Sequence, residues 1–152
     1  MIFQTKYFGE IDCSEDKVFH FPDGLPGFEN ERTFLLIPFD GSSGTMYSLQ
    51  STMTPSLSFV AMDPFSLLPD YEPVLSLSDL RQFDDAFQWS DLSYCVLCSV
   101  KNPVSESTVN LKCPIAINLD TKEAHQIIMD TDKYNMRHLL VEFSKKEEDE
   151  TC

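Results

Sequence analysis

Short runs of apolar residues alternate with turn-forming glycine, proline, serine and aspartate along most of the chain. Runs of this length and spacing are typical of an all-β domain, because strands are short and are joined by such turns. We therefore predict an all-β fold, either a sandwich or a closed, barrel-like sheet. The expected strands are residues 2–11, 17–21, 34–39, 46–50, 57–62, 92–100, 108–112, 115–118 and 124–129.

One segment has a helical period instead. Leu80, Phe83 and Phe87 recur at spacings of three and four residues, which places them on one face of a helix. Ser78 precedes them, and serine is a preferred residue at a helix N-cap. The pattern predicts one short helix over about residues 78–88.

The composition fits one globular domain. Of 152 residues, 42% are hydrophobic and 12% aromatic, which is enough apolar material for a buried core. Because the run at residues 145–150 is entirely charged, we expect a β domain over residues 1–141 and a charged, flexible tail over residues 142–152. No apolar run approaches the ~20 residues of a membrane helix and no signal peptide is evident, so we expect a cytoplasmic protein.

The chain is strongly acidic, with 25 acidic against 11 basic residues and a formal net charge of −14. This balance argues against direct binding of nucleic acid, which depends on lysine and arginine at the phosphates. Two interpretations of the charge stay open. It favours a basic protein partner, because a field of one sign accelerates association, and it also serves solubility alone.

Five cysteines are present, and two of them, Cys95 and Cys98, have the spacing of a CxxC motif. A zinc site needs about four ligands, and no second CxxC or histidine pair accompanies this one. Redox CxxC pairs usually begin a helix, whereas these lie in an expected strand, where residues three apart face opposite sides. We therefore expect structural thiols, with no metal and no cofactor.

The motifs of common enzyme classes are missing from the sequence. There is no Gly-x-Ser-x-Gly elbow and no glycine-rich phosphate-binding loop with its lysine. Of the three histidines, His20 lies in an expected strand among phenylalanines, where a structural role is favoured over catalysis. We therefore assign no catalytic residues and expect a protein that is not an enzyme.

The segment at residues 21–28, here called the corner, contains two glycines and two prolines within eight residues. Glycine adopts backbone angles that other residues avoid, and proline fixes φ. We therefore predict a rigid, sharply bent turn whose Phe21, Leu25 and Phe28 are available to a core.

A second segment, residues 63–71, combines an acid, a proline and aromatic residues, and is here called the Asp63 segment. Pro64 restricts Asp63 to extended backbone, so Asp63 and Phe65 are presented at a defined angle after a strand. Two interpretations stay open. The segment is either a surface anchor for a partner, since aromatics are enriched at binding hot spots, or a loop that folds onto the sheet.

Six motifs follow one another in order and are too specific together to arise by chance. They are Phe21-Pro-Asp-Gly-Leu-Pro-Gly-Phe28, Tyr47-Ser-Leu-Gln-Ser51, Pro55-Ser-Leu-Ser-Phe59, Asp63-Pro-Phe65 with Asp70-Tyr71, Ser107-Thr-Val-Asn-Leu-Lys-Cys-Pro-Ile-Ala-Ile-Asn118, and Tyr134-Asn-Met-Arg-His138. In this order the chain resembles the FliW family of bacterial flagellar assembly factors over roughly residues 2–140. It departs from the usual family pattern at Lys112-Cys113 and at Leu139.

The resemblance implies an antiparallel β-barrel-like single domain that binds proteins and catalyses no reaction. By this resemblance the chain is expected to bind flagellin in the cytoplasm, and also CsrA, an RNA-binding repressor of translation. Flagellin and CsrA would compete for it, so that secretion of flagellin frees it to capture CsrA and relieve repression of flagellin translation. The alternative is a general acidic chaperone or scaffold for secreted or basic client proteins, whose binding would collapse as salt rises.

The same resemblance, together with the corner and the Asp63 segment, gives the candidates for partner contacts. We expect a monomer with no nucleic-acid and no membrane partner. The candidate partner-binding residues are Leu25, Phe28, Asp63, Phe65, Asp70, Tyr71 and Asn118.

Overall fold

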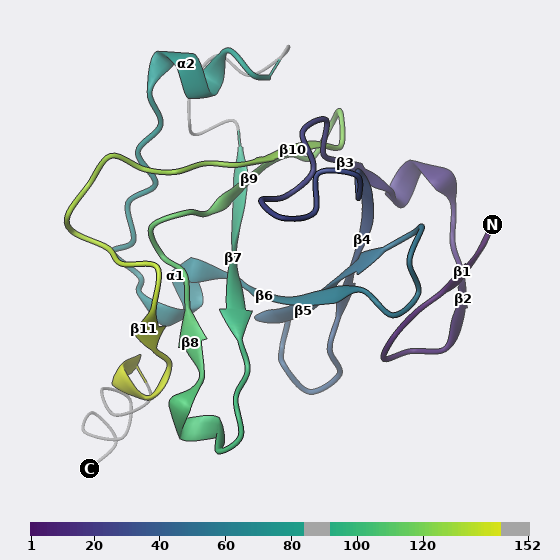
Figure 1. Ribbon diagram of the computed structural model, residues 1–152, viewed down its shortest axis with the longest axis horizontal. Helices are drawn as coiled ribbons and strands as arrows, with labels where there is room; N and C mark the ends of the chain where they lie inside the picture. The colour runs from purple at the N-terminus through teal and green to yellow at the C-terminus, as the bar shows by residue number, and fades with distance from the viewer. Residues whose placement is uncertain (84–91, 144–152) are drawn as a thin grey trace.

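A closed barrel of seven strands forms the body of the molecule in the computed structural model, which describes residues 1–83 and 92–143 (Figure 1). In order round the ring, the strands are β3 (Phe19–His20), β4 (Thr33–Pro38), β5 (Met46–Ser51), β6 (Ser58–Met62), β7 (Ser93–Ser99), β9 (Ile115–Asn118) and β10 (Glu123–Gln126). The ring closes because β7 pairs with β9 as well as with β6, and β10 pairs with β3. Every pair in the ring is antiparallel except β10 with β3. The predicted all-β, barrel-like fold is therefore confirmed.

Outside the ring lie a hairpin, two strands that extend the sheet beyond β7, and short helices. These elements are β1 (Ile2–Gln4), β2 (Glu10–Asp12), η1 (Glu15–Lys17), α1 (Pro64–Leu67), α2 (Leu77–Leu80), η3 (Val104–Glu106), β8 (Thr108–Val109) and β11 (His138–Leu139). Within residues 1–83 and 92–143, no helix is long and apolar enough to cross a membrane.

Alternate residues of the strands fill the barrel. Phe34 of β4 and Leu49 of β5 are fully buried, and they belong to one core cluster with Cys95 of β7 and Ile115 of β9. Because side chains alternate across a strand, Leu35 faces the other side of β4. There it packs in a separate cluster beneath the β1–β2 hairpin.

The single strand predicted over residues 2–11 is wrong, because the chain reverses within it. Thr5 donates both its backbone N–H and its hydroxyl to the carbonyl oxygen of Gly9. Gly9 has a φ of 64°, a backbone conformation that other residues avoid. The two arms of this turn are β1 and β2, which pair antiparallel.

The strand predicted over residues 17–21 is shorter than expected. Lys17 and Val18 donate their backbone N–H groups to Ser14 and Glu15, and these bonds form the tight turn η1. The turn withdraws residues 15–17 from the sheet, so β3 keeps only two residues. The barrel wall is consequently incomplete beside β4.

The strands predicted over residues 108–112 and 124–129 also end early. Leu111 and Lys112 donate their backbone N–H groups to the carbonyl oxygen of Asn135, a loop residue. Met129 likewise donates to Lys112 rather than to a strand. Leu111 and Met129 belong to a core cluster that also contains Val96 of β7 and Ala116 of β9.

The helix predicted over residues 78–88 is misplaced at its start. The N-cap is Ser76 rather than Ser78. The side chains of Ser76 and Asp79 each accept the backbone N–H of the other residue, which makes a capping box. The α-helix α2 then ends at Leu80. Residues 84–88 of the prediction lie outside the described residues, as do residues 144–152 of the predicted tail.

Candidate functional site

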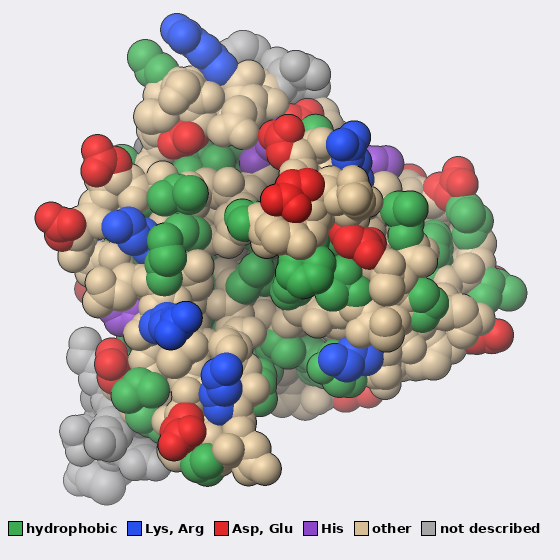
Figure 2. Space-filling view, in the orientation of Figure 1, with side chains coloured by type: hydrophobic (Ala, Val, Ile, Leu, Met, Phe, Trp, Pro, Cys, Tyr) green, Lys and Arg blue, Asp and Glu red, His purple; other side chains and the backbone are tan. Residues whose placement is uncertain are grey.

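An apolar groove of about 930 Å³ opens in the barrel wall beside β4, where a longer β3 would run. Figure 2 shows hydrophobic side chains gathered in a hollow near the middle of this face. The floor is apolar, because it is formed by buried members of the barrel core such as Cys95 and Ile117. Residues from several elements line the groove: Ile11, Cys13, Lys17, Phe19, Leu35, Leu36, Ile37, Pro38, Tyr47, Asp63, Phe65, Leu92, Ser93, Tyr94, Cys95, Ile117, Leu119 and Lys122.

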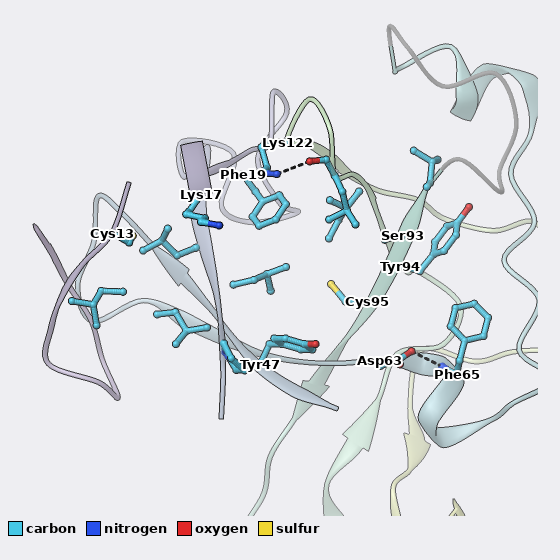
Figure 3. Close-up of a pocket in the computed structure, with 18 residues that line it drawn as sticks. Cys13, Lys17, Phe19, Tyr47, Asp63, Phe65, Ser93, Tyr94, Cys95 and Lys122 are labelled. Atoms are coloured by element: carbon cyan, nitrogen blue, oxygen red, sulfur yellow. Dashed lines mark hydrogen bonds between the residues drawn. The ribbon is translucent and has the colours of Figure 1, made fainter. Parts of the chain in front are cut away.

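One end of the groove carries two lysines. Lys17 and Lys122 lie there beside Phe19 (Figure 3). The ammonium of Lys122 donates to the carbonyl oxygen of Leu119 at 2.5 Å and lies 5.7 Å from the centroid of the Phe19 ring. Nearby Asp16 has a pKa below its usual value, chiefly because of a hydrogen bond with Ser14 and also because of the two lysines.

Asn118 shapes the turn that presents Lys122. Its side-chain oxygen accepts the backbone N–H groups of Asp120 and Thr121, at 3.0 and 3.2 Å. Lys122 in turn donates its backbone N–H to the carbonyl oxygen of Asn118 and has a φ of 64°. Asn118 itself is buried, so its role in this structure is to hold the turn.

The Asp63 segment forms the other end of the groove. The carboxylate of Asp63 accepts the backbone N–H of Phe65 at 2.9 Å and so caps α1, with Pro64 in the first turn (Figure 3). Phe65 remains 39% exposed at the rim of the groove. Its ring meets that of Tyr71 edge to face, with centroids 5.8 Å apart. The cap and the ring contact together fix the direction of Phe65.

Tyr71 anchors the Asp63 segment from beneath. It is only 3% exposed, and its hydroxyl donates to the carbonyl oxygen of Leu111 at 2.7 Å. Burial raises the pKa of Tyr71 well above its usual value, so this phenol stays protonated as the donor. The segment is therefore a loop folded onto the sheet that also exposes one aromatic ring. Its role as a surface anchor for a partner stays a prediction.

The corner lies outside the groove lining. A Cβ on Gly24 would come within 2.6 Å of the carbonyl oxygen of Phe28, and its φ is 64°, so glycine is required here. Leu25 is buried in the barrel core. Phe28 is 41% exposed and contacts the Phe59 ring edge to face, with centroids 5.2 Å apart. The predicted rigid turn is confirmed.

The structure brings together only part of the predicted contact set. Asp63 and Phe65 line the groove, whereas Leu25, Phe28 and Asp70 do not. The binding roles of the predicted residues stay predictions. Sequence reasoning missed the two groove lysines, because a lysine before a strand and a lysine in a turn carry no local signal that the strands beside them pair.

Of the CxxC cysteines, Cys95 is buried and Cys98 is partly buried. Cys95 belongs to the barrel core and Cys98 packs against the other core cluster, on the opposite face of β7. Burial raises the pKa of each thiol to about 12, which suppresses the reactive thiolate. Within the described part of the chain, no group of three or more histidine, cysteine, aspartate or glutamate residues could hold a metal ion.

The buried histidine is His125 rather than His20, which is exposed. The ring nitrogens of His125 lie 2.6 Å from a carboxylate oxygen of Glu123 and 3.6 Å from one of Asp23. Its ring also meets Phe83 edge to face at 4.8 Å. His125 thus connects β10 with the corner and with the segment that follows α2, which favours a structural role.

A closed ring of strands with an apolar groove in its wall defines a small β-barrel protein. The crystal structure of a flagellar assembly factor FliW matches it with a TM-score of 0.83 and 33% identity, over 92% of this chain and 96% of that one. The family model described as FliW protein matches residues 2–140. The chain therefore belongs to the FliW family.

Two relatives illustrate the extent of the likeness. The flagellar assembly factor FliW of Desulfitobacterium hafniense is 35% identical over 97% of this chain and 96% of that protein. The FliW of Alkaliphilus metalliredigens is 31% identical over 99% of this chain and 93% of that protein. The family resemblance of the sequence motifs is confirmed, and the matched region includes every residue of the groove lining.

Proposed function

We propose that this protein is a non-catalytic flagellar assembly factor of the cytoplasm that binds flagellin and the translational repressor CsrA in turn. Flagellin occupies the protein until it is secreted, and the freed protein then captures CsrA and relieves repression of flagellin translation. The observation that carries the proposal is the match to flagellar assembly factors over nearly the whole chain, groove included.

The net charge of −14 supports the CsrA half of the proposal. An RNA-binding protein must carry basic surface, because neutralisation of phosphates and release of counterions drive its binding. An acidic domain docked beside that surface places negative potential where RNA must approach. The Debye length at physiological salt is about 8 Å, so the acidic face must dock within that distance of the RNA site.

The groove supports the flagellin half. Flagellin has terminal regions that form helices in the filament and are poorly structured before assembly. An apolar groove with an aromatic rim suits an amphipathic helix or an extended segment of such a chain. The rim ring of Phe65 and the apolar floor provide these features.

The test is a pull-down with the tagged full-length protein from lysate of its source cells at moderate salt, read by mass spectrometry. We expect flagellin and a CsrA homologue as the dominant captured proteins, and each should displace the other when added in excess. Capture of many basic or secreted proteins, lost together as salt rises, would instead support a general acidic chaperone. Capture of neither partner by a bait shown to be folded would overturn the proposed function.

A further inference from the structure

We propose that the groove binds an extended segment of a partner protein, which adds as a strand to the open edge of β4 and brings a carboxylate to Lys17 and Lys122. This inference deepens the proposed function, because it rests on the groove being a partner site and states the backbone form and charge of what binds there. According to this inference, the occupant of the groove is extended rather than helical.

The edge of β4 is open along the last four of its six residues. β3 pairs with β4 only at Thr33 and Phe34, because η1 takes the preceding residues out of the sheet. Among the described residues, no strand pairs with Leu35–Pro38 on that side. All of Leu35–Pro38 line the groove. The groove therefore occupies the place of a missing strand.

The hydrogen-bond register shows which backbone groups are free for a partner. The carbonyl oxygen of Thr33 accepts the backbone N–H of Thr52, and the backbone N–H of Phe39 donates to the carbonyl oxygen of Met46. The odd-numbered residues of β4 therefore bond to β5. In an antiparallel ladder the intervening residues point their N–H and C=O groups to the other side. Phe34 meets β3 there, and Leu36 is the next such residue. Leu36 thus offers a donor and an acceptor to the groove.

Pro38 limits the length of the added strand. It also points away from β5, but proline has no N–H, so only its carbonyl oxygen is available. The open edge of Leu35–Pro38 is about 13 Å long at the rise of a β-strand. A segment of about four residues fills it. A proline at an exposed edge also restrains uncontrolled strand pairing, which explains how the protein keeps such an edge without pairing indiscriminately.

The side-chain chemistry of the occupant follows from the two ends and the floor. Alternate residues of an added strand would point at the apolar floor beneath Leu36, so they must be apolar. Lys17 and Lys122 at one end favour a carboxylate there. Among the described lining residues Asp63 is the only acid, and it lies at the other end and already caps α1. Asp16 lies beside the two lysines but outside the lining. The groove is therefore complementary to an apolar strand with one anionic end.

A first test uses amide hydrogen exchange by NMR on the full chain. In the free protein the Leu36 amide should exchange at least about tenfold faster than those of Leu35 and Ile37, which bond to β5. The probes are short synthetic peptides of alternating valine and threonine with two aspartates at the N-terminal or the C-terminal end. Saturation with the peptide of matching direction should slow exchange at Leu36. A Leu36 amide already protected in the free protein would overturn the proposal.

Two sets of variants make the test specific. N-methylation of one alternate set of peptide amides should abolish binding, while methylation of the other set should leave it intact. Lys17→Glu should weaken binding at least about fivefold, whereas Lys101→Glu, the same charge change at an exposed lysine outside the groove, should leave it unchanged. Binding that tolerates both methylations and leaves Leu36 unprotected would assign the groove to a helix or a small amphiphile.

The outcome is separable from that of the proposed function. If the peptides bind as stated while flagellin and CsrA are not captured, the strand-addition site stands and the proposed function fails. If either protein is captured without any effect on Leu36 exchange or from Lys17→Glu, the strand-addition site fails and the proposed function stands.

Discussion

The corner and the Asp63 segment are built alike but lie against different surroundings. Each is held by two deeply buried residues, Phe21 and Leu25 in the corner and Pro64 and Tyr71 in the other. Each leaves one aromatic ring partly exposed, Phe28 at 41% and Phe65 at 39%. Of the two rings only Phe65 lines the groove, because the Asp63 segment, which follows β6, forms one end of it. Local sequence thus determines how a segment is fixed, while the fold determines what its exposed ring meets.

The largest effect is expected from breaking the corner. Gly24→Ala should lower the free energy of unfolding by about 3 kcal/mol, because the new Cβ meets backbone atoms at a positive φ. Gly27→Ala is the matched control, since Gly27 also has a positive φ but a Cβ there meets nothing within 4 Å. It should cost only about 1 kcal/mol. Urea unfolding of the two variants measures both, and equal losses would mean that the close approach at Gly24 does not hold the corner.

Breaking the anchor of the Asp63 segment should have the next largest effect. Tyr71→Phe leaves the buried carbonyl oxygen of Leu111 without its donor, at a cost of about 2 kcal/mol. Tyr47→Phe removes an exposed hydroxyl bond to Gly44 and should change stability by about 0.5 kcal/mol or less. Thermal and urea unfolding give the comparison. A Tyr71→Phe variant as stable as the wild type would show that the ring alone anchors the segment.

Replacement of each exposed ring by serine compares the two segments in partner binding rather than in stability. Phe65→Ser and Phe28→Ser each remove a partly exposed ring with one edge-to-face contact, so both should cost about 1 kcal/mol of stability. Only Phe65→Ser should also weaken binding of the peptide probes, by about fivefold, because Phe65 alone lines the groove. Fluorescence anisotropy of labelled peptide measures this. Equal losses of affinity would remove the distinction between the two segments.

The smallest effect concerns the thiol beneath the Asp63 segment. The pKa of Cys95 is raised to about 12, mainly by burial and in small part by the charges of Cys98 and Asp63. At pH 8 the thiolate is therefore scarce, and Cys95 should react with Ellman's reagent far more slowly than the partly buried Cys13. Mass spectrometry after timed labelling identifies the reacted residue. Reaction of Cys95 as fast as Cys13 would show that the groove floor opens in solution.

The sequence predicts the fold where apolar runs are bounded by strong turn signals. The strands over residues 34–39 and 46–50, joined by a glycine-rich loop, are found with small shifts in their ends. Prediction fails where a local hydrogen bond competes with the sheet, as in the turn from Thr5 to Gly9 and in η1. Periodicity does not detect such bonds, because they depend on side-chain geometry at one or two positions.

The candidate site is predictable only in part, for a related reason. Asp63-Pro64-Phe65 signals its own geometry, because the proline and the cap act on neighbouring residues. The open edge at Leu36 arises because a different segment forms η1 instead of a strand that pairs with β4. No property of the sequence near Leu36 reports the absence of a neighbour.

The last pairing in the ring joins His20 of β3 to Glu123 of β10, near opposite ends of the chain. A contact between residues so distant in sequence forms late in folding, because a long loop must be closed first. A ribosome takes on the order of 10 s to synthesise the chain up to β10, and until then the barrel cannot close. The barrel of each copy therefore closes only after nearly all of the chain has been translated.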